Sequence, residues 1–282
     1  MNVLEFLETH STFTDSERTV VQYVLEHTEE VLNASIYTVA EKTNTSTPTI
    51  VRLCKKCGLK GFKEFKIALA RDLEFQLNTI RSVDVNIPFE SKDPDLVISK
   101  KIAHLSSETI LSTQQLMTTS KLNYAVKLIN NAENLFGIGV SDTYLRLKDF
   151  QLKLLRINVY LKMIDLQAEQ YHLAKNTGKN DVAIIISNSG KTAEIVNDAK
   201  EFYMNKTPII AITGNPKSPL ANYESVLFEL PRQEDEKFKV SNFSSQLAIE
   251  YILNVLYSCI FNSNFDENIL ANKSTPTSLF EF

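Results

Sequence analysis

The apolar run Val182–Ile186, followed directly by the polar loop Ser187–Thr192, constrains the fold of this 282-residue chain more than any other feature. Five consecutive apolar residues without alternation predict a short strand that is buried on both faces. Such strands are typical of parallel sheets covered by helices on both sides. The C-terminal half is therefore predicted to be an α/β domain.

Strand and helix patterns alternate regularly from residue 134 onward. Expected strands lie at 135–138, 159–161, 182–187, 208–213 and 226–230, and expected helices at 144–155, 193–202 and 244–261. This alternation predicts a five-stranded parallel sheet flanked by helices. In a doubly wound sheet of order 2-1-3-4-5, ligands bind where the loops after the first and third strands meet.

Those two loops have the composition of an anion site. Gly137-Ile-Gly139-Val-Ser141 follows the first strand, and Ser187-Asn-Ser189-Gly190-Lys191-Thr192 follows the third. Hydroxyls, an unobstructed Gly190 N–H, a lysine and the amides of a helix N-terminus suit a phosphate monoester. A βα turn that merely needs tight geometry is the competing interpretation of the first loop.

Two nucleotide-binding motifs are excluded by spacing. A P-loop requires glycine five residues before Gly190, but Ile185 stands there. A dinucleotide fingerprint requires glycine three residues after Gly139, where Asp142 stands instead. No cofactor is expected.

A helix-turn-helix is predicted within residues 1–77, where every pattern is helical. One helix follows the cap residue Ser35 over 36–42, and the next begins near Ser46 and ends at Gly58. In this motif the second helix enters the major groove of DNA. A helical hairpin that supports some other surface is the alternative.

The charge distribution favours the DNA-binding interpretation. Residues 42–71 hold eight basic residues and one acidic residue, whereas the rest of the chain holds 22 basic and 33 acidic residues. A basic block on an acidic protein is typical of a nucleic-acid-binding module. Arg52 is expected to read guanine, and the other expected contacts with operator DNA are Ser46, Thr47, Thr49, Lys55, Lys56, Lys60 and Lys63.

Cysteine usage and hydropathy indicate a cytoplasmic protein. Three cysteines give no disulfide framework, and Cys54-Lys-Lys-Cys57 lacks the further ligands of a closed zinc site. Both are interpreted as small buried helix residues, and no metal site is expected. No apolar run approaches the roughly 20 residues of a membrane helix, and the N-terminus lacks the features of a signal peptide. No membrane partner is therefore expected.

Composition gives the expected domain boundaries. Residues 1–77 form the DNA-binding domain, 78–121 a linker with a connecting helix, and 122–262 the α/β domain. The linker is indicated by the polar, proline-containing stretch before residue 95. The polar tail 263–282 is expected to be loosely ordered.

With these motifs placed, the chain resembles the RpiR family of bacterial regulators over nearly its whole length. Residues 47–66 are similar to that family's helix-turn-helix. Residues 122–262 resemble a sugar isomerase (SIS) domain, whose signatures stand as Gly139-Val-Ser141, Ser187–Thr192 and Ala211–Leu220.

The resemblance implies a flavodoxin-like sheet, a phosphosugar that tunes DNA affinity, and a homodimer or higher homo-oligomer. It also brings 239–245 near the ligand, so the expected ligand-binding residues are Gly139, Val140, Ser141, Ser187, Asn188, Ser189, Gly190, Lys191, Thr192, Ser241 and Ser244. Lys191 departs from the family, which usually has an acid there.

A sugar-phosphate isomerase or lyase is the alternative function. Such chemistry requires a positioned general base, and the candidates Glu194, Glu169 and His172 have no spacing that specifies catalysis. No catalytic residue is therefore assigned. A structural adaptor that does not bind DNA would leave the basic block unexplained.

Overall fold

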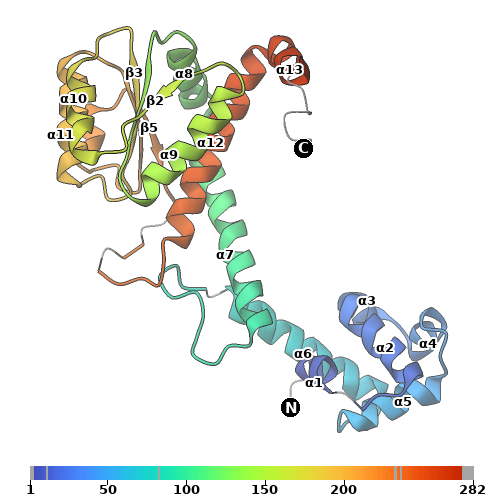
Figure 1. Ribbon diagram of the computed structural model, residues 1–282. Helices are drawn as coiled ribbons and strands as arrows, with labels where there is room; N and C mark the ends of the chain where they lie inside the picture. Colours follow the sequence, from blue (N-terminus) through green and yellow to red (C-terminus); the bar gives the residue numbers. More distant parts are fainter. Residues whose placement is uncertain (1–2, 11, 82, 232–233, 236, 275–282) are drawn as a thin grey trace, which may run out of the picture. The chain divides into compact units, whose positions relative to one another are not determined.

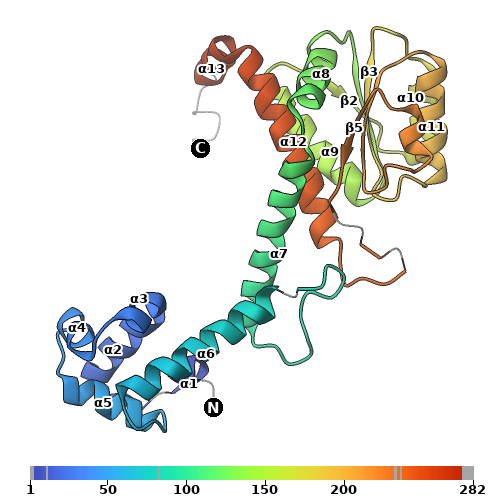
Figure 2. The same cartoon turned by 180° about the vertical axis from the view of Figure 1, so that it is seen from behind.

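The computed structural model describes residues 3–10, 12–81, 83–231, 234–235 and 237–274. The chain forms two compact units, Met1–Ser82 and Val83–Phe282 (Figures 1 and 2). The last helix of the first unit runs to Arg81, past residue 77, which is the domain end expected from the sequence.

The N-terminal unit is entirely helical in its described part. Its helices are α1 (Val3–Thr9), α2 (Asp15–Glu26), α3 (Thr28–Asn33), α4 (Ile36–Lys42), α5 (Thr47–Lys56) and α6 (Phe62–Arg81). A capping box formed by Thr14 and Glu17 begins α2. The apolar faces of all six helices meet in one core, which includes Val20, Ile50 and Leu69.

The predicted helix-turn-helix is formed by α4 and α5. The Ser35 side chain caps α4, as its sequence position predicts. Asn44 turns the chain with a φ of 51°, and the amide of Thr45 bonds back to the Ala40 carbonyl at 2.9 Å. Gly58, with a φ of 71°, follows the end of α5.

The C-terminal unit is built on a five-stranded parallel sheet of order β2-β1-β3-β4-β5. The strands are β1 (Leu135–Ile138), β2 (Leu161–Lys162), β3 (Val182–Ile186), β4 (Ile209–Thr213) and β5 (Val226–Glu229). All of β3 and β4 is buried, as the unbroken apolar runs predict. The expected strand order and the switch between β1 and β3 are confirmed.

Helices cover both faces of this sheet (Figure 1). On one face lie α8 (Thr119–Asn130), α9 (Asp142–Leu155) and α12 (Phe243–Ser263), with α7 (Asp95–Leu116) packed along α12. On the other lie α10 (Gln170–Lys175), α11 (Ala193–Met204) and the 3₁₀ turns η1 (Gln167–Glu169) and η2 (Leu220–Tyr223). Each face has its own apolar core.

Two details differ from the sequence-based expectation. The second strand begins at Leu161 rather than residue 159, because Asn158 has a φ of 59° and the Val159 amide bonds back to Leu154. The expected loose tail begins with the helix α13 (Phe265–Ser274), in which the Phe265 ring packs edge-on against Phe261 at 5.8 Å. Residues 275–282 of that tail lie outside the described residues.

Candidate functional site

A cavity of about 830 Å³ lies at the carboxyl ends of β1 and β3. The connections that follow β1, β3, β4 and β5 supply its walls, together with one residue that precedes α7. The lining residues are Asn86, Val140, Thr143, Ile186, Ser187, Asn188, Ser189, Lys191, Thr192, Asn215, Glu234, Asp235, Lys237 and Lys239. This is the place where a doubly wound sheet binds ligands.

The serine loop, Ser187–Thr192, is a tight turn that requires glycine at one position. Gly190 has a φ of 64°, and a Cβ there would overlap the Ser218 side chain and lie 2.9 Å from Thr213 Oγ1. Its N–H donates to the Ser187 carbonyl and to Ser187 Oγ, both at 3.1 Å. The expected unobstructed Gly190 N–H is therefore wrong, because the turn itself uses that donor.

The hydroxyls of the serine loop bond within the loop, and the Ser189 hydroxyl keeps its proton to donate. Ser189 Oγ accepts from the Lys191 amide at 3.2 Å, and Ser187 Oγ and Thr192 Oγ1 are 3.3 Å apart. A hydroxyl has one donor and two acceptor positions, so Ser189 can still donate to an anion. Thr192 is also the N-cap residue of α11, whose first amides and dipole favour negative charge.

A buried carboxylate stands in the same cavity. Glu234 is buried, and its oxygens accept from the Ser245 amide and the Ser245 hydroxyl, both at 2.8 Å. Lys239 Nζ lies 3.3 Å from Glu234 Oε2. The cavity therefore combines a loop of hydroxyls and a helix N-terminus with a carboxylate that accepts hydrogen bonds, a pairing suited to a ligand with both an anionic group and hydroxyl donors.

The second candidate site is the exposed face of α5. Thr47 and Pro48 form its first turn, and Arg52 and Lys55 are exposed further along it. Lys60 and Lys63 are exposed just after α5 and at the start of α6. Exposed cations on and just after the second helix of a helix-turn-helix are suited to contact DNA.

Comparison with known proteins identifies both units. Residues 1–76 match the model of the helix-turn-helix domain of the rpiR family, and residues 128–256 match that of the SIS domain. The chain is 30% identical to an uncharacterised HTH-type transcriptional regulator of Caldanaerobacter subterraneus, over 96% of this chain and 95% of that one. The chain belongs to the RpiR family of transcriptional regulators.

Two further relatives match this chain over nearly its whole length. The RpiR-type chain is 26% identical to the HTH-type transcriptional regulator HexR of Escherichia coli, over 95% of this chain and 92% of HexR. Vibrio vulnificus NanR, solved in complex with ManNAc-6P, is 25% identical and superposes with a TM-score of 0.59 over 97% of this chain and 96% of NanR. None of the described helices is long and apolar enough to cross a membrane.

Two of the expected DNA contacts in the helix-turn-helix domain also bond to protein atoms. Thr49 is buried, and its hydroxyl lies 3.0 Å from Ser46 Oγ and accepts from Arg52 at 3.3 Å. Lys56 Nζ donates to the buried Glu17 carboxylate at 2.6 Å and to the Thr12 carbonyl at 3.1 Å. Helical spacing did not separate the buried Thr49 from the exposed positions of α5.

Five of the expected ligand residues in the SIS domain do not line the cavity: Gly139, Ser141, Gly190, Ser241 and Ser244. Gly139 admits the first turn of α9, since a Cβ there would lie 2.9 Å from Thr143 Oγ1. The Ser141 hydroxyl is exposed and donates to its neighbour Asp142 at 3.1 Å. Ser241 is exposed, whereas Ser244 is buried against Thr109 of α7 at 2.9 Å. Gly139 and Ser141 were expected from loop position, and Ser241 and Ser244 from the family resemblance; neither gives the direction of a side chain.

Other lining residues were missed from the sequence. They are Asn86, Thr143, Ile186, Asn215, Glu234, Asp235 and Lys237. Lys239, which also lines the cavity, lies in the stretch 239–245 that the family resemblance brought near the ligand. The dense charges between β5 and α12 were a usable signal in the sequence. Asn86 had no signal, since it lies in the stretch interpreted as a linker.

The two cysteines of the CxxC pair lie in the core of the helix-turn-helix domain. Burial raises the pKa of the Cys54 thiol to about 12 and that of Cys57 to about 11. Both thiols are therefore protonated near neutral pH and act as small apolar residues, as their sequence context predicts.

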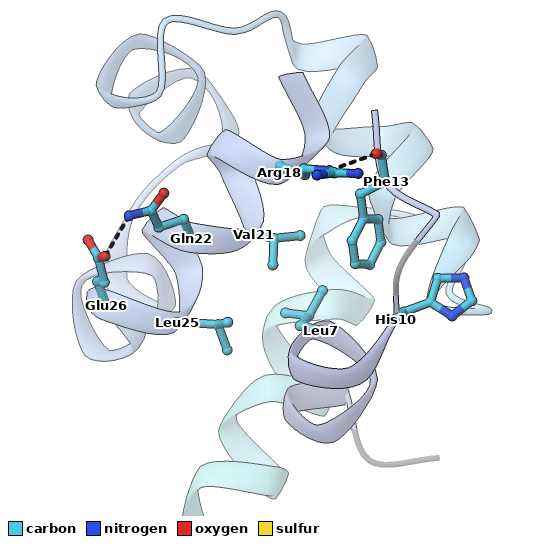
Figure 3. A pocket seen from close by; sticks show the side chains of 8 residues that line it. All are labelled: Leu7, His10, Phe13, Arg18, Val21, Gln22, Leu25 and Glu26. Atoms are coloured by element: carbon cyan, nitrogen blue, oxygen red, sulfur yellow. Dashed lines mark hydrogen bonds between the residues drawn. The ribbon is translucent and has the colours of Figure 1, made fainter. Parts of the chain in front are cut away.

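A second cavity, of about 510 Å³, lies between α1 and α2 (Figure 3). Leu7, Phe13, Val21 and Leu25 form its apolar wall. The polar groups around it bond to protein atoms, since Arg18 Nε donates to the Phe13 carbonyl at 3.1 Å and Gln22 donates to Glu26 at 2.9 Å. No residue of α5 lines this cavity, so it is separate from the DNA-reading helix.

Proposed function

We propose that the regulator binds a sugar phosphate in the SIS cavity, with the phosphate on the serine loop. The observation that carries this proposal is the convergence of Ser187, Ser189 and Thr192 with the N-terminus of α11 at the sheet's switch point. Charge-assisted hydrogen bonds from hydroxyls and helix amides favour a phosphate monoester there. That the relative NanR was solved with ManNAc-6P supports the same ligand class.

The charges of the cavity support one orientation of such a ligand. The buried Glu234 carboxylate repels a phosphate and accepts hydrogen bonds from sugar hydroxyls. The phosphate therefore lies on the serine loop and the sugar extends toward the β5–α12 connection. Lys237 and Lys239 line this side of the cavity and balance the two carboxylates there.

Ligand-dependent thermal shifts across hexose and amino-sugar phosphates, ManNAc-6P among them, test this proposal, since a bound ligand raises stability by mass action. The variant that combines Ser189→Ala with Thr192→Ala removes two donors to the phosphate. A loss of about 3 kcal/mol, or about a hundredfold in affinity, is expected. Ser241→Ala is the matched control, because Ser241 is exposed and outside the cavity. Unchanged affinity in the double variant would place the phosphate elsewhere.

The proposed role excludes turnover of the bound sugar phosphate. The three predicted candidates for a general base, Glu194, Glu169 and His172, are all exposed and none lines the cavity. Glu234 does line it, so Glu234→Gln is the variant that examines the isomerase alternative. Purified protein is expected to form no product from the sugar phosphate that stabilises it. Product formation that Glu234→Gln abolishes would establish an enzyme.

A homodimer through α9 completes the proposal. Leu145, Leu152 and Leu155 lie on one face of α9 and are 60%, 61% and 53% exposed. A second copy of this chain is the occupant that symmetry favours, since most soluble oligomers are homo-oligomers, and two DNA-binding domains then read two half-sites. Leu145→Glu with Leu152→Glu is expected to give a monomer in sedimentation equilibrium. A dimer of unchanged stability would show that α9 is not the interface.

A further inference from the structure

The stretch that leads out of the helix-turn-helix domain supplies a wall of the SIS cavity. Asn86 lines the cavity and lies only five residues after the end of α6 at Arg81. Its side-chain Oδ1 accepts from the Asp235 amide at 2.7 Å, and its carbonyl accepts from the Val240 amide at 2.9 Å. We call this pair of hydrogen bonds the Asn86 clasp. It joins the residues before α7 to the connection between β5 and α12 (Figure 2).

Local interactions fix the shape of this stretch around Asn86. The Asp84 carboxylate accepts from the amides of Asn86 and Ile87 at 2.6 and 3.1 Å, an Asx turn. Further on, the Asp93 carboxylate accepts from the Glu90 amide and from Lys101 of α7, both at 2.8 Å. Lys101 is itself buried. The stretch is therefore an ordered part of the cavity rather than a loose tether.

The chemistry of the clasp sets the direction of the Asn86 amide. A backbone N–H can only donate, so the side-chain atom that faces Asp235 must be the oxygen. The Nδ2 group, with two N–H donors, then lies on the other branch of the amide. Since Asn86 lines the cavity, this donor suits sugar oxygens, whereas the serine loop suits the phosphate.

We propose that Asn86 donates a hydrogen bond to the sugar part of the ligand. The stretch that follows the helix-turn-helix domain then contacts the bound ligand directly. This inference rests on the proposed sugar-phosphate function. A ligand shifts an equilibrium only by binding one arrangement better than another. A hydrogen bond from Asn86 supplies that difference in affinity, because the Nδ2 donor is not held at the cavity when the Asn86 clasp is open. DNA binding and sugar binding then influence each other by equal factors.

The test compares affinities for two probes in the full-length chain. The first is the best-binding compound among ManNAc-6P, glucosamine 6-phosphate and glucose 6-phosphate, and the second is inorganic phosphate, which lacks the sugar. Asn86→Ala is expected to weaken sugar-phosphate binding about fivefold, the effect of one neutral hydrogen bond. Inorganic phosphate binding is expected to stay within twofold, since the serine loop is untouched. Glu90→Gln is the matched control, an exposed position on the same stretch.

Two further measurements separate ligand contact from a purely structural role. Asn86→Asp keeps the oxygen that accepts from Asp235 but lacks the Nδ2 donor, so slow hydrogen exchange at the Asp235 amide is expected to persist while sugar-phosphate affinity falls. In Asn86→Ala, a saturating concentration of the sugar phosphate is expected to change operator affinity less than twofold. The wild-type response should lie in the range of about 5- to 150-fold that is typical of allosteric coupling.

The outcomes distinguish this inference from the function on which it rests. Equal losses of sugar phosphate and inorganic phosphate in Asn86→Ala, or no loss of either, would overturn the role of Asn86 alone. A wild-type chain that binds none of the three sugar phosphates would overturn both proposals. If sugar phosphate binds the wild-type chain and the Ser189→Ala, Thr192→Ala variant equally well, the phosphate does not lie on the serine loop. The Asn86→Ala measurements then still test whether Asn86 contacts the sugar.

Discussion

The recognition helix α5 and the serine loop use their polar residues in opposite ways. On α5, Arg52 and Lys55 are exposed, whereas Leu53 and its apolar neighbours hold the helix in the core. In the serine loop, Ser187 and Gly190 form the turn with the same polar groups that an anion site would use. Binding and stability are thus separable on α5, but they are coupled in the loop.

The substitution with the largest expected effect on stability is Gly190→Ala in the serine loop. A left-handed backbone at a φ of 64° and overlap with the Ser218 side chain both oppose a Cβ there. The two costs together are expected to lower the free energy of unfolding of the SIS domain by about 2–5 kcal/mol. Urea titration followed by circular dichroism measures it.

Gly178→Ala is the matched control within the same domain. A Cβ at Gly178 meets nothing within 4 Å, so the expected change is below about 1 kcal/mol. Equal destabilisation by both substitutions would show that the serine loop tolerates a side chain. In that case its glycine would be dispensable for the turn.

The fold was largely predictable because its signals are local and repeated. Strand β1 and the cap of α4 at Ser35 stand at their expected positions, and the sheet order follows from parallel βα units. The second strand failed because it has only two residues, Leu161 and Lys162. So short a strand carries no periodicity, and the turn at Asn158 occupies the place where the strand was expected to begin.

The site was less predictable because loops supply it and loop residues have no periodicity. Composition identified the serine loop as a candidate ligand site, but the direction of each side chain decides whether its hydroxyl faces the cavity. Ser244 turns toward α7 and Ser141 toward Asp142. Asn86 reaches the cavity through contacts 149 residues away in sequence, which no local pattern can reveal.

The adjacent residues Lys55 and Lys56 of α5 allow DNA binding and stability to be tested separately in the helix-turn-helix domain. Lys56→Ala leaves the buried Glu17 carboxylate without its ion pair, so a loss of about 1–3 kcal/mol of stability is expected. Lys55→Ala is the matched variant, because Lys55 is exposed. It is expected to leave stability unchanged and to reduce the salt dependence of DNA binding by about one unit of slope. Reversed effects of the two substitutions would contradict the assigned roles.

Arg52 and Lys60 separate base reading from phosphate contact. Arg52→Ala is expected to cost about 1–3 kcal/mol of operator affinity and to relax preference at one base position. Lys60→Ala is expected to weaken binding evenly across sequences. Binding to a randomised operator library, scored by sequencing, measures both. A uniform loss in Arg52→Ala would reassign that side chain to the DNA backbone.

The smallest expected effects concern two buried carboxylates with opposite pKa shifts. Glu17 and Asp198 are each 3% exposed. Burial alone raises the pKa of Glu17, but hydrogen bonds from Lys56 and Thr14 and the Lys56 charge bring it below 4.5. Burial, with the charge of Glu194 beside it, raises the pKa of Asp198 from 3.8 to about 6.

These shifts give the two carboxylates opposite contributions to the pH dependence of stability. The stability that ionised Glu17 supplies is present above the pKa of its unfolded form and is lost as pH falls through the folded value. Folded Asp198 binds a proton that the unfolded chain has released, so SIS-domain stability falls as pH rises from about 4 to about 6. Asp198→Asn is therefore expected to stabilise the SIS domain by about 1–2 kcal/mol at pH 7 and to flatten its profile over that interval. Urea titrations at pH 4.5 and pH 7 measure the difference, with Glu194→Gln as a weaker change in the same direction. A fall in stability at pH 7 in Asp198→Asn would mean that the carboxylate is stabilised by its surroundings.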